Sequence, residues 1–171
     1  MVDGETTTYN RVRMDWALEG PEDFRRGLIQ GIAESDASVN VSGQEVEFWI
    51  GPSWDLASGL LSSFGISSFR NREALAISKS QVKKAFMVPI LAPHLQTYRY
   101  QKLSKLATAE HITRGTRLPQ HLREEIRLGA LRGLSVPAIS ELLVDKFGVI
   151  LTFEAVQRWA MPGVKSVNEP V

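Results

Sequence analysis

Hydrophobic and polar residues along the first two thirds of the chain follow two alternating periodicities, one typical of helices and one typical of strands. Apolar residues recur at helical spacing, between proline, serine or glycine, in four segments: 22–35, 52–64, 78–88 and 94–109. Two further segments, 39–50 and 66–77, alternate apolar with polar residues, as two-stranded hairpins do. The predicted turns are Ser42-Gly43-Gln44 and Asn71-Arg72. The pattern therefore predicts the order helix, hairpin, helix, hairpin, helix, helix.

This order predicts an α+β fold. Antiparallel hairpins with helices packed on one face form a sandwich, which we expect over residues 14–110. Three shorter helical segments follow and predict a small all-α unit over residues 111–162: 119–132, 135–146 and 152–160. We expect residues 1–13 and 163–171 to be flexible tails.

Composition narrows the class of protein. The chain has 171 residues, 43% of them hydrophobic and 23% charged, which is too apolar for a disordered protein. It has no cysteine, which excludes disulfide scaffolds, thiolate zinc fingers and cysteine nucleophiles. The polar, acidic start MVDGETTTYN is unlike a secretory signal, and no window is apolar enough to span a membrane. We therefore expect a cytoplasmic protein with no membrane partner.

The net charge of +1 is unevenly distributed. Residues 1–110 hold 12 Lys or Arg against 13 Asp or Glu, whereas residues 111–171 hold eight against six. Five arginines lie within the stretch 114–132 alone. A nucleic-acid partner is therefore compatible with the second unit, although the chain as a whole is not strongly basic.

Gly27, Gly31 and Ser35 follow one another at four-residue spacing, so they form a smooth stripe along the first predicted helix. A glycine inside a helix costs about 1 kcal/mol relative to alanine, so a compensating contact is expected. Close approach of a second helix is the usual reason for such a stripe. The second helix belongs either to this chain or to a second copy of it.

Glu34 and Asp36 lie at the C-terminal end of the same helix, where the helix dipole disfavours carboxylates by about 0.3–1 kcal/mol each. A divalent cation would reverse this penalty, because hard metal ions prefer oxygen ligands. Alternatively, Asp36 only turns the chain into the first strand, since Asp tolerates turn conformations.

The segment IQGIAESDA at positions 29–37 resembles the LAGLIDADG motif of homing endonucleases. Gly31 and Asp36 are identical to the motif, whereas three residues depart from it: Gln30, Ala33 and Ala37. The expected order of helices and hairpins also follows that family, and the resemblance covers about residues 20–108. It implies an αββαββα core with an antiparallel sheet.

In that family two such helices cross at a two-fold or pseudo-two-fold axis, so a chain with one motif implies a homodimer. The resemblance makes Gly27, Gly31 and Ser35 the dimer-packing residues. It implies an Mg²⁺ site at Asp36 and Ala37, with Asp36 and Lys79 as the catalytic pair. The placement of Lys79 is an interpretation of its position after the second hairpin, as is that of Gln44 or Glu47 as a residue that orients water.

In the LAGLIDADG family the sheet faces DNA, and alternation predicts which residues face outward here. They are Asn40, Ser42, Glu45, Glu47, Trp49, Arg70, Arg72, Ala74 and Ala76. The predicted DNA contacts among them are Asn40, Ser42, Arg70 and Arg72. The two glutamates oppose binding to phosphates, which supply much of the affinity of such proteins.

The segment from Leu122 to Trp159 resembles the helix-turn-helix of small resolvase- and repressor-type DNA-binding units. Ser135 and Thr152 are the predicted caps of its second and third helices. The predicted DNA contacts are Arg114, Arg117, Thr152, Gln157 and Arg158. The alternative is a three-helix bundle that contacts protein.

Two hypotheses on function follow. The first is a metal-dependent, site-specific DNA endonuclease that hydrolyses phosphodiester bonds as a homodimer. The second is a catalytically degenerate transcriptional regulator of the same fold that binds double-stranded DNA through its helix-turn-helix. A protein-interaction module is the third possibility, and a lack of salt-dependent DNA binding would favour it.

Overall fold

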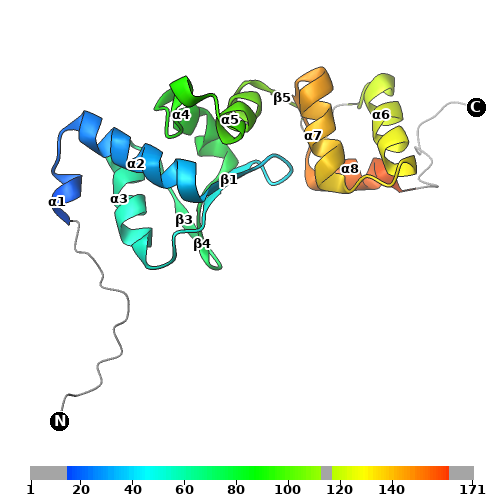
Figure 1. Ribbon diagram of the computed structural model, residues 1–171. Coiled ribbons are helices and arrows are strands. Elements are labelled where there is room, and N and C mark those ends of the chain that lie inside the picture. The colour runs from blue at the N-terminus through cyan, green and yellow to red at the C-terminus, as the bar shows by residue number, and fades with distance from the viewer. Residues whose placement is uncertain (1–14, 113–116, 162–171) are drawn as a thin grey trace, which may run out of the picture.

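The computed structural model describes residues 15–112 and 117–161 and shows an α+β protein with a small antiparallel sheet (Figure 1). The first part contains, in chain order, α1 (Asp15–Leu18), α2 (Glu22–Asp36), β1 (Ala37–Asn40), β2 (Glu45–Phe48), η1 (Gly51–Ser53), α3 (Trp54–Ser63), β3 (Phe69–Asn71), β4 (Ala74–Ile77), α4 (Lys79–Met87), η2 (Pro93–Leu95) and α5 (Tyr98–Thr108). The second part contains β5 (Glu110–His111), α6 (Gln120–Leu131), α7 (Val136–Phe147), β6 (Val149–Ile150) and α8 (Phe153–Ala160). The α+β class is thus confirmed, with the predicted helices and hairpins of residues 22–108 in the expected order.

The four-stranded sheet has the strand order β1-β2-β4-β3, with every neighbouring pair antiparallel. Its covered face carries apolar residues in register, such as Val39 opposite Val46 and Phe48 opposite Leu75. These side chains share one core with buried residues of α2 to α5, including Ile29 and Leu103. Alternation along the strands therefore predicted the buried face of the first hairpin correctly.

Two element boundaries differ from the prediction. The helix expected from residue 94 begins at Tyr98, because Gln96 has a positive φ of 47° and the Thr97 side chain caps the helix by accepting from the Tyr100 N–H. The second hairpin turns at Arg72-Glu73 rather than Asn71-Arg72, since Asn71 still pairs with Ala74. Arg72 has a φ of 55°, which a tight turn requires.

Helices α6, α7 and α8 surround a second core that contains Leu122, Ile126, Ile139, Leu143 and Val156. The side chains of Ser135 and Thr152 accept from the backbone N–H groups three residues ahead, as predicted for helix caps. Gly133 and Gly148 end α6 and α7 with positive φ angles of 77° and 63°. The three helices predicted in this part are confirmed.

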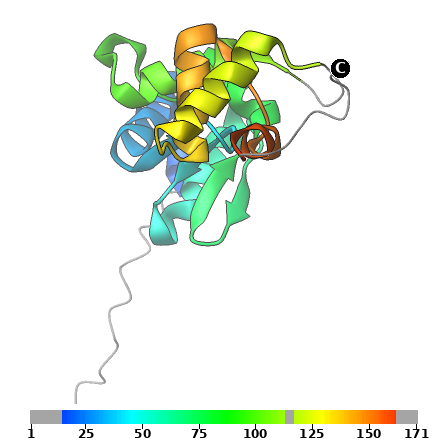
Figure 2. The same ribbon diagram turned by 90° about the vertical axis from the view of Figure 1, so that its right-hand side faces the viewer.

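The two parts meet through a pair of two-residue strands that the sequence did not predict. In this parallel pair Glu110 lies opposite Val149 and His111 opposite Ile150. Two ion pairs at 2.5 Å also join α5 to α7: Lys102–Glu141 and Lys105–Asp145. Consequently α7 lies nearest to the first part and α6 farthest from it (Figures 1 and 2).

Candidate nucleic-acid interface

The C-terminus of α2 is capped by Arg99 from α5. The guanidinium donates from Nη1 to the Glu34 carbonyl at 2.6 Å, from Nη2 to the Ser35 carbonyl at 3.3 Å and from Nε to the Ala37 carbonyl at 2.6 Å. These carbonyls belong to the last turn of the helix and the first strand residue, where backbone acceptors lack helical partners. Arg99 therefore places a permanent positive charge at the negative end of the α2 dipole.

This cap explains why two acids are tolerated there. Glu34 accepts a hydrogen bond from the Ala92 N–H at 3.0 Å, so its carboxylate ties the segment after α4 to α2. Asp36 is exposed and accepts from the Ser35 hydroxyl at 2.8 Å. The unfavourable position of both carboxylates is thus offset by Arg99, without the need for a metal ion.

The predicted magnesium site fits these residues poorly. The carbonyl of Ala37, the second predicted ligand, is already bonded to Arg99, as is the carbonyl of Ser35 on the other side of Asp36. A fixed guanidinium charge at this point repels a divalent cation. Within residues 15–112 and 117–161, no three His, Asp or Glu side chains cluster as metal ligands.

Lys79 lies apart from Asp36. It lines a cavity together with Gln44, which follows the far end of β1, whereas Asp36 immediately precedes the first residue of that strand. The predicted catalytic pair is therefore not brought together within one chain. Glu47 faces the open side of the sheet and accepts from the Asn71 side chain at 3.3 Å.

The glycine stripe of α2 is uncovered. A Cβ added to Gly27 or Gly31 would meet no atom of the described residues within 4 Å. The Ser35 hydroxyl lies 3.1 Å from the carbonyls of both Gly31 and Ile32, so this side chain does not project far from the helix surface. Two exposed aromatic rings, Trp16 and Phe24, stack 5.7 Å apart beside the N-terminal end of the same helix.

One residue predicted for the open face of the sheet lies on the other face. Arg70 pairs with Leu75, so both point to the side covered by helices, and the Arg70 guanidinium lies 3.6 Å from the centre of the Trp54 ring. The predicted placement of Arg70 toward DNA is therefore wrong. The two-residue turn pairs Asn71 with Ala74, which reverses the odd–even alternation between the two strands, so Phe69 and Asn71 lie on the open face instead.

The open face is acidic. By the observed register it carries the side chains of Ser38, Asn40, Glu45, Glu47, Phe69, Asn71, Ala74 and Ala76. Burial raises the pKa of Glu45, and the nearby charge of Glu47 raises it further. Two carboxylates without a basic strand residue on the same side make this face a weak phosphate-binding surface.

Asn40 and Ser42 serve the turn of the first hairpin. The Asn40 Oδ1 atom accepts from the Ser42 hydroxyl at 3.0 Å and from the Gly43 N–H at 2.9 Å. Arg72 is exposed at the tip of the second hairpin. A role for any of these three residues in binding DNA stays a prediction.

Helix α8 presents one continuous exposed face. Phe153, Glu154, Gln157, Arg158 and Met161 are exposed, and their spacing of one, three and four residues places them on one side of the helix. The opposite side carries the buried Val156 and the half-buried Trp159. Thr152 is the N-cap, and its hydroxyl oxygen accepts from the Ala155 N–H at 3.3 Å.

Three acids of the second part form ion pairs. Glu141 and Asp145 on α7 face the lysines of α5, and Glu125 is buried in an ion pair with Lys146 at 2.5 Å. Helices α6 and α8 carry arginines together with the exposed acids Glu124 and Glu154. The guanidinium groups of Arg123 and Arg127 lie 5.3 and 5.4 Å from the Trp159 ring centre.

Two of the predicted DNA contacts precede α6. Arg117 is exposed just ahead of the helix, and Arg114 lies outside the described residues. No described carboxylate forms an ion pair with Arg117, Arg127 or Arg158. We refer to these three exposed arginines together as the outer basic face, a name for the set and not a measured surface.

Arg99 is the residue at the C-terminus of α2 that sequence reasoning missed, because its contacts to α2 span more than 60 positions and leave no local signal.

None of the described helices is both long and apolar enough to cross a membrane.

No family model, no curated protein and no solved structure matches the chain.

Proposed function

We propose that this chain is a sequence-specific double-stranded DNA-binding protein that binds its target without cutting it. In this proposal α7 and α8 form the helix-turn-helix, and the α+β part carries the dimer contact. The observation that carries the proposal is the exposed face of α8, which includes Arg158, together with the exposed Arg117 and Arg127, which form no ion pair with a described carboxylate.

Electrostatics favours α6 and α8 over the open face of the sheet as the DNA-binding surface. The acids of α7 are neutralised by lysines of α5, so their charge does not oppose that of the outer arginines. Arg117, Arg127 and Arg158 have no carboxylate partner among the described residues, so they are available for phosphate groups, which position a protein along the duplex. The open face of the sheet has the opposite character, because Glu45 and Glu47 repel phosphates.

The side chains of α8 suit base recognition. Arg158 matches the two acceptors of guanine in the major groove, and Gln157 matches the donor and acceptor of adenine. Phe153 and Met161 offer apolar contact to thymine methyl groups from the same face. A short helix that follows a cap residue and a tight turn is the usual geometry for this kind of reading.

The uncovered stripe of α2 supports a homodimer. Gly27 and Gly31 carry the helical penalty of glycine but have no packing partner among the described residues. A second copy of α2 crossing at this point would bury the stripe, and the exposed rings of Trp16 and Phe24 would extend the contact. Two copies would then carry two helix-turn-helix units, as palindromic sites require.

Endonuclease activity is the second candidate function. The exposed carboxylate of Asp36 at the end of an uncovered stripe favours it, because a dimer would bring two such acids together. The Arg99 cap opposes it, since it occupies the carbonyls on both sides of Asp36. On balance the geometry favours binding without cleavage.

The test is selection of bound duplexes from a randomised library by the full-length protein, followed by affinity measurements on the recovered sequence. We expect Arg158→Ala and Gln157→Ala each to weaken binding about tenfold or more and to relax the preference at one base position. Lys83→Ala is the matched control, because it removes an exposed cation of the α+β part that is not a predicted DNA contact. Recovery of no preferred sequence, or an equal loss with Lys83→Ala, would contradict this assignment.

A further inference from the structure

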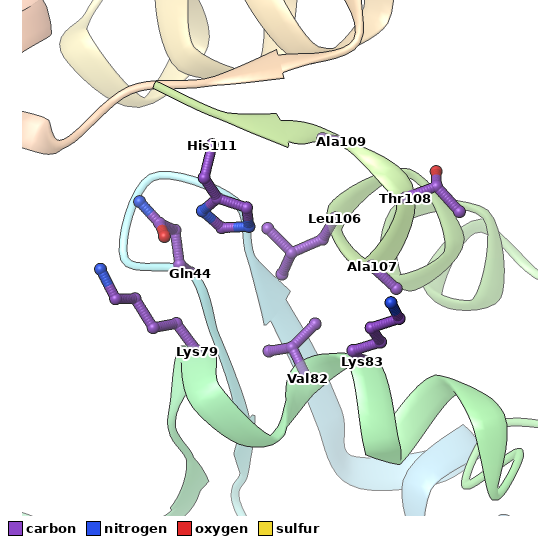
Figure 3. A pocket seen from close by; sticks show the side chains of 9 residues that line it. All are labelled: Gln44, Lys79, Val82, Lys83, Leu106, Ala107, Thr108, Ala109 and His111. Atoms are coloured by element: carbon purple, nitrogen blue, oxygen red, sulfur yellow. The ribbon is translucent and has the colours of Figure 1, made fainter. Parts of the chain in front are cut away.

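A cavity of about 460 Å³ lies between α4, α5, the β1–β2 turn and β5 (Figure 3). Its volume falls in the range of small-molecule sites, about 300–1,000 Å³. The lining residues are Gln44, Lys79, Val82, Lys83, Leu106, Ala107, Thr108, Ala109 and His111. The proposed DNA-binding function does not use this cavity, although Lys79 and Gln44 are also the residues that the endonuclease hypothesis assigns to catalysis.

The polar lining is positive. Lys79 and Lys83 come from the first turns of α4, and the ring of His111 reaches toward the cavity from β5 on the opposite side (Figure 3). No carboxylate lines the cavity, and no described acid forms an ion pair with either lysine. Three nitrogen-bearing side chains without an acid among them favour an anionic group.

Gln44 supplies a second, independent sign of a ligand. Its side chain is only 5% exposed, and its Oε1 atom is buried with no hydrogen-bond partner among the described residues. A buried acceptor left unpaired costs about 1–3 kcal/mol. Gln44 also holds a left-handed backbone with a φ of 57°, which is uncommon for a residue other than glycine, Asn or Asp. A donor group in the cavity would satisfy the amide oxygen.

The remaining lining is apolar. Val82 and Leu106 are buried and face each other across the cavity in Figure 3, and Ala107 and Ala109 complete this part of the wall. A ligand with carbon–hydrogen surface would therefore gain contact area beyond its charged group.

We propose that this cavity binds a small phosphate ester that carries a hydroxyl donor, with Lys79, Lys83 and His111 at the phosphate and Gln44 at the hydroxyl. A sugar phosphate has this chemistry. Because His111 belongs to the β5–β6 pair that joins the two parts, occupancy also stabilises the position of the helix-turn-helix unit. This inference does not depend on the proposed function, since binding of the small molecule is measured alone.

Isothermal titration of the full-length protein with inorganic phosphate, ribose 5-phosphate and a short DNA duplex tests the proposal. We expect one saturable site for ribose 5-phosphate, with higher affinity than for inorganic phosphate. Lys79→Gln and Lys83→Gln should each weaken it about tenfold. Arg132→Gln, which removes an exposed arginine far along the chain from the cavity, is the matched control and should leave it unchanged.

Gln44→Met separates a ligand role from a purely structural one. Methionine has the length of glutamine but no polar atom, so the variant should keep or raise the thermal midpoint of the free protein. It should also remove the preference for ribose 5-phosphate over inorganic phosphate. Absence of saturable binding at millimolar concentration, equal effects of Arg132→Gln and Lys79→Gln, or an effect of Lys79→Gln on duplex binding alone would overturn the proposal.

Discussion

The guanidinium of Arg99 donates hydrogen bonds to three backbone carbonyls at the C-terminus of α2. By contrast, the guanidinium groups of Arg127 on α6 and Arg158 on α8 have no carboxylate partner among the described residues. The first arginine completes the fold, whereas the other two are exposed, with Arg127 also lying over the Trp159 ring. An acid at a helix end is therefore weak evidence for a metal site until the basic residues packed against it are known. Unpaired arginines beside an exposed helix face are better evidence for an anionic partner.

The largest effect is expected on the free energy of unfolding, when Arg99 no longer caps α2. Arg99→Met should lower the free energy of unfolding by about 2–3 kcal/mol, because three carbonyls lose a charged donor and Glu34 and Asp36 lose their nearby cation. Urea denaturation measures it. Arg72→Met, at an exposed hairpin tip, should change stability by less than about 0.5 kcal/mol. Equal stability of the two variants would show that the cap contributes nothing.

The glycine stripe tests whether α2 also serves a partner. Gly31→Leu should convert a dimer into a monomer in sedimentation experiments, because the added side chain keeps two helices apart. The monomer itself should gain about 0.8 kcal/mol, since leucine is a better helix former than glycine. Ser62→Leu on the exposed side of α3 is the matched control. Unchanged self-association in Gly31→Leu would remove the basis for dimerisation through this helix.

The outer basic face is tested by salt. If Arg127 contacts a phosphate, Arg127→Gln should weaken binding to all duplexes alike and reduce the slope of log affinity against log salt by about 1. Fluorescence anisotropy at several salt concentrations measures the slope. A slope identical to that of the parent protein would show that Arg127 lies outside the interface.

The smallest effect concerns the acidic face of the sheet. Because the pKa of Glu45 is raised on folding, the folded chain binds this proton more tightly than the unfolded chain, and the stability from this group is lost as pH rises through the folded pKa. Glu45→Gln should therefore be slightly more stable than the parent at neutral pH, with the difference vanishing below pH 4.5, the usual glutamate value. Glu73→Gln is the exposed control. A difference independent of pH would show that the charge is not responsible.

Local signals were sufficient for most of the fold. The alternation of Val46 and Phe48 with glutamates, and the caps at Ser135 and Thr152, are encoded within a few residues, so the sequence predicted them. The two-residue strands β5 and β6 have no periodicity that a sequence pattern could reveal. The face of Arg70 was mispredicted because the two-residue turn places Asn71 and Ala74, three positions apart, on the same face, so alternation cannot be counted straight through the turn.

The candidate site was less predictable, since its decisive contacts are long-range. Nothing near Arg99 in the sequence indicates that it caps a helix more than 60 positions earlier. Likewise, Lys102 and Lys105 form ion pairs with acids of α7 about 40 positions later. Only the fold shows that these acids pair with lysines of α5 and not with the outer arginines. The exposure of Glu154, Gln157 and Arg158 on α8 was predicted from helical spacing, whereas Thr152 is half-buried and the exposure of Phe153 and Met161 was not predicted.

The most direct test of binding without cleavage compares a change on α8 with a change at the end of α2, on one selected duplex in the presence of Mg²⁺. Mobility shift and product analysis in the same reaction report binding and cleavage for the parent protein, Arg158→Ala and Asp36→Asn. The account predicts an intact duplex throughout, affinity about tenfold lower for Arg158→Ala, and parental affinity for Asp36→Asn. Cleavage by the parent protein that is lost in Asp36→Asn would contradict it.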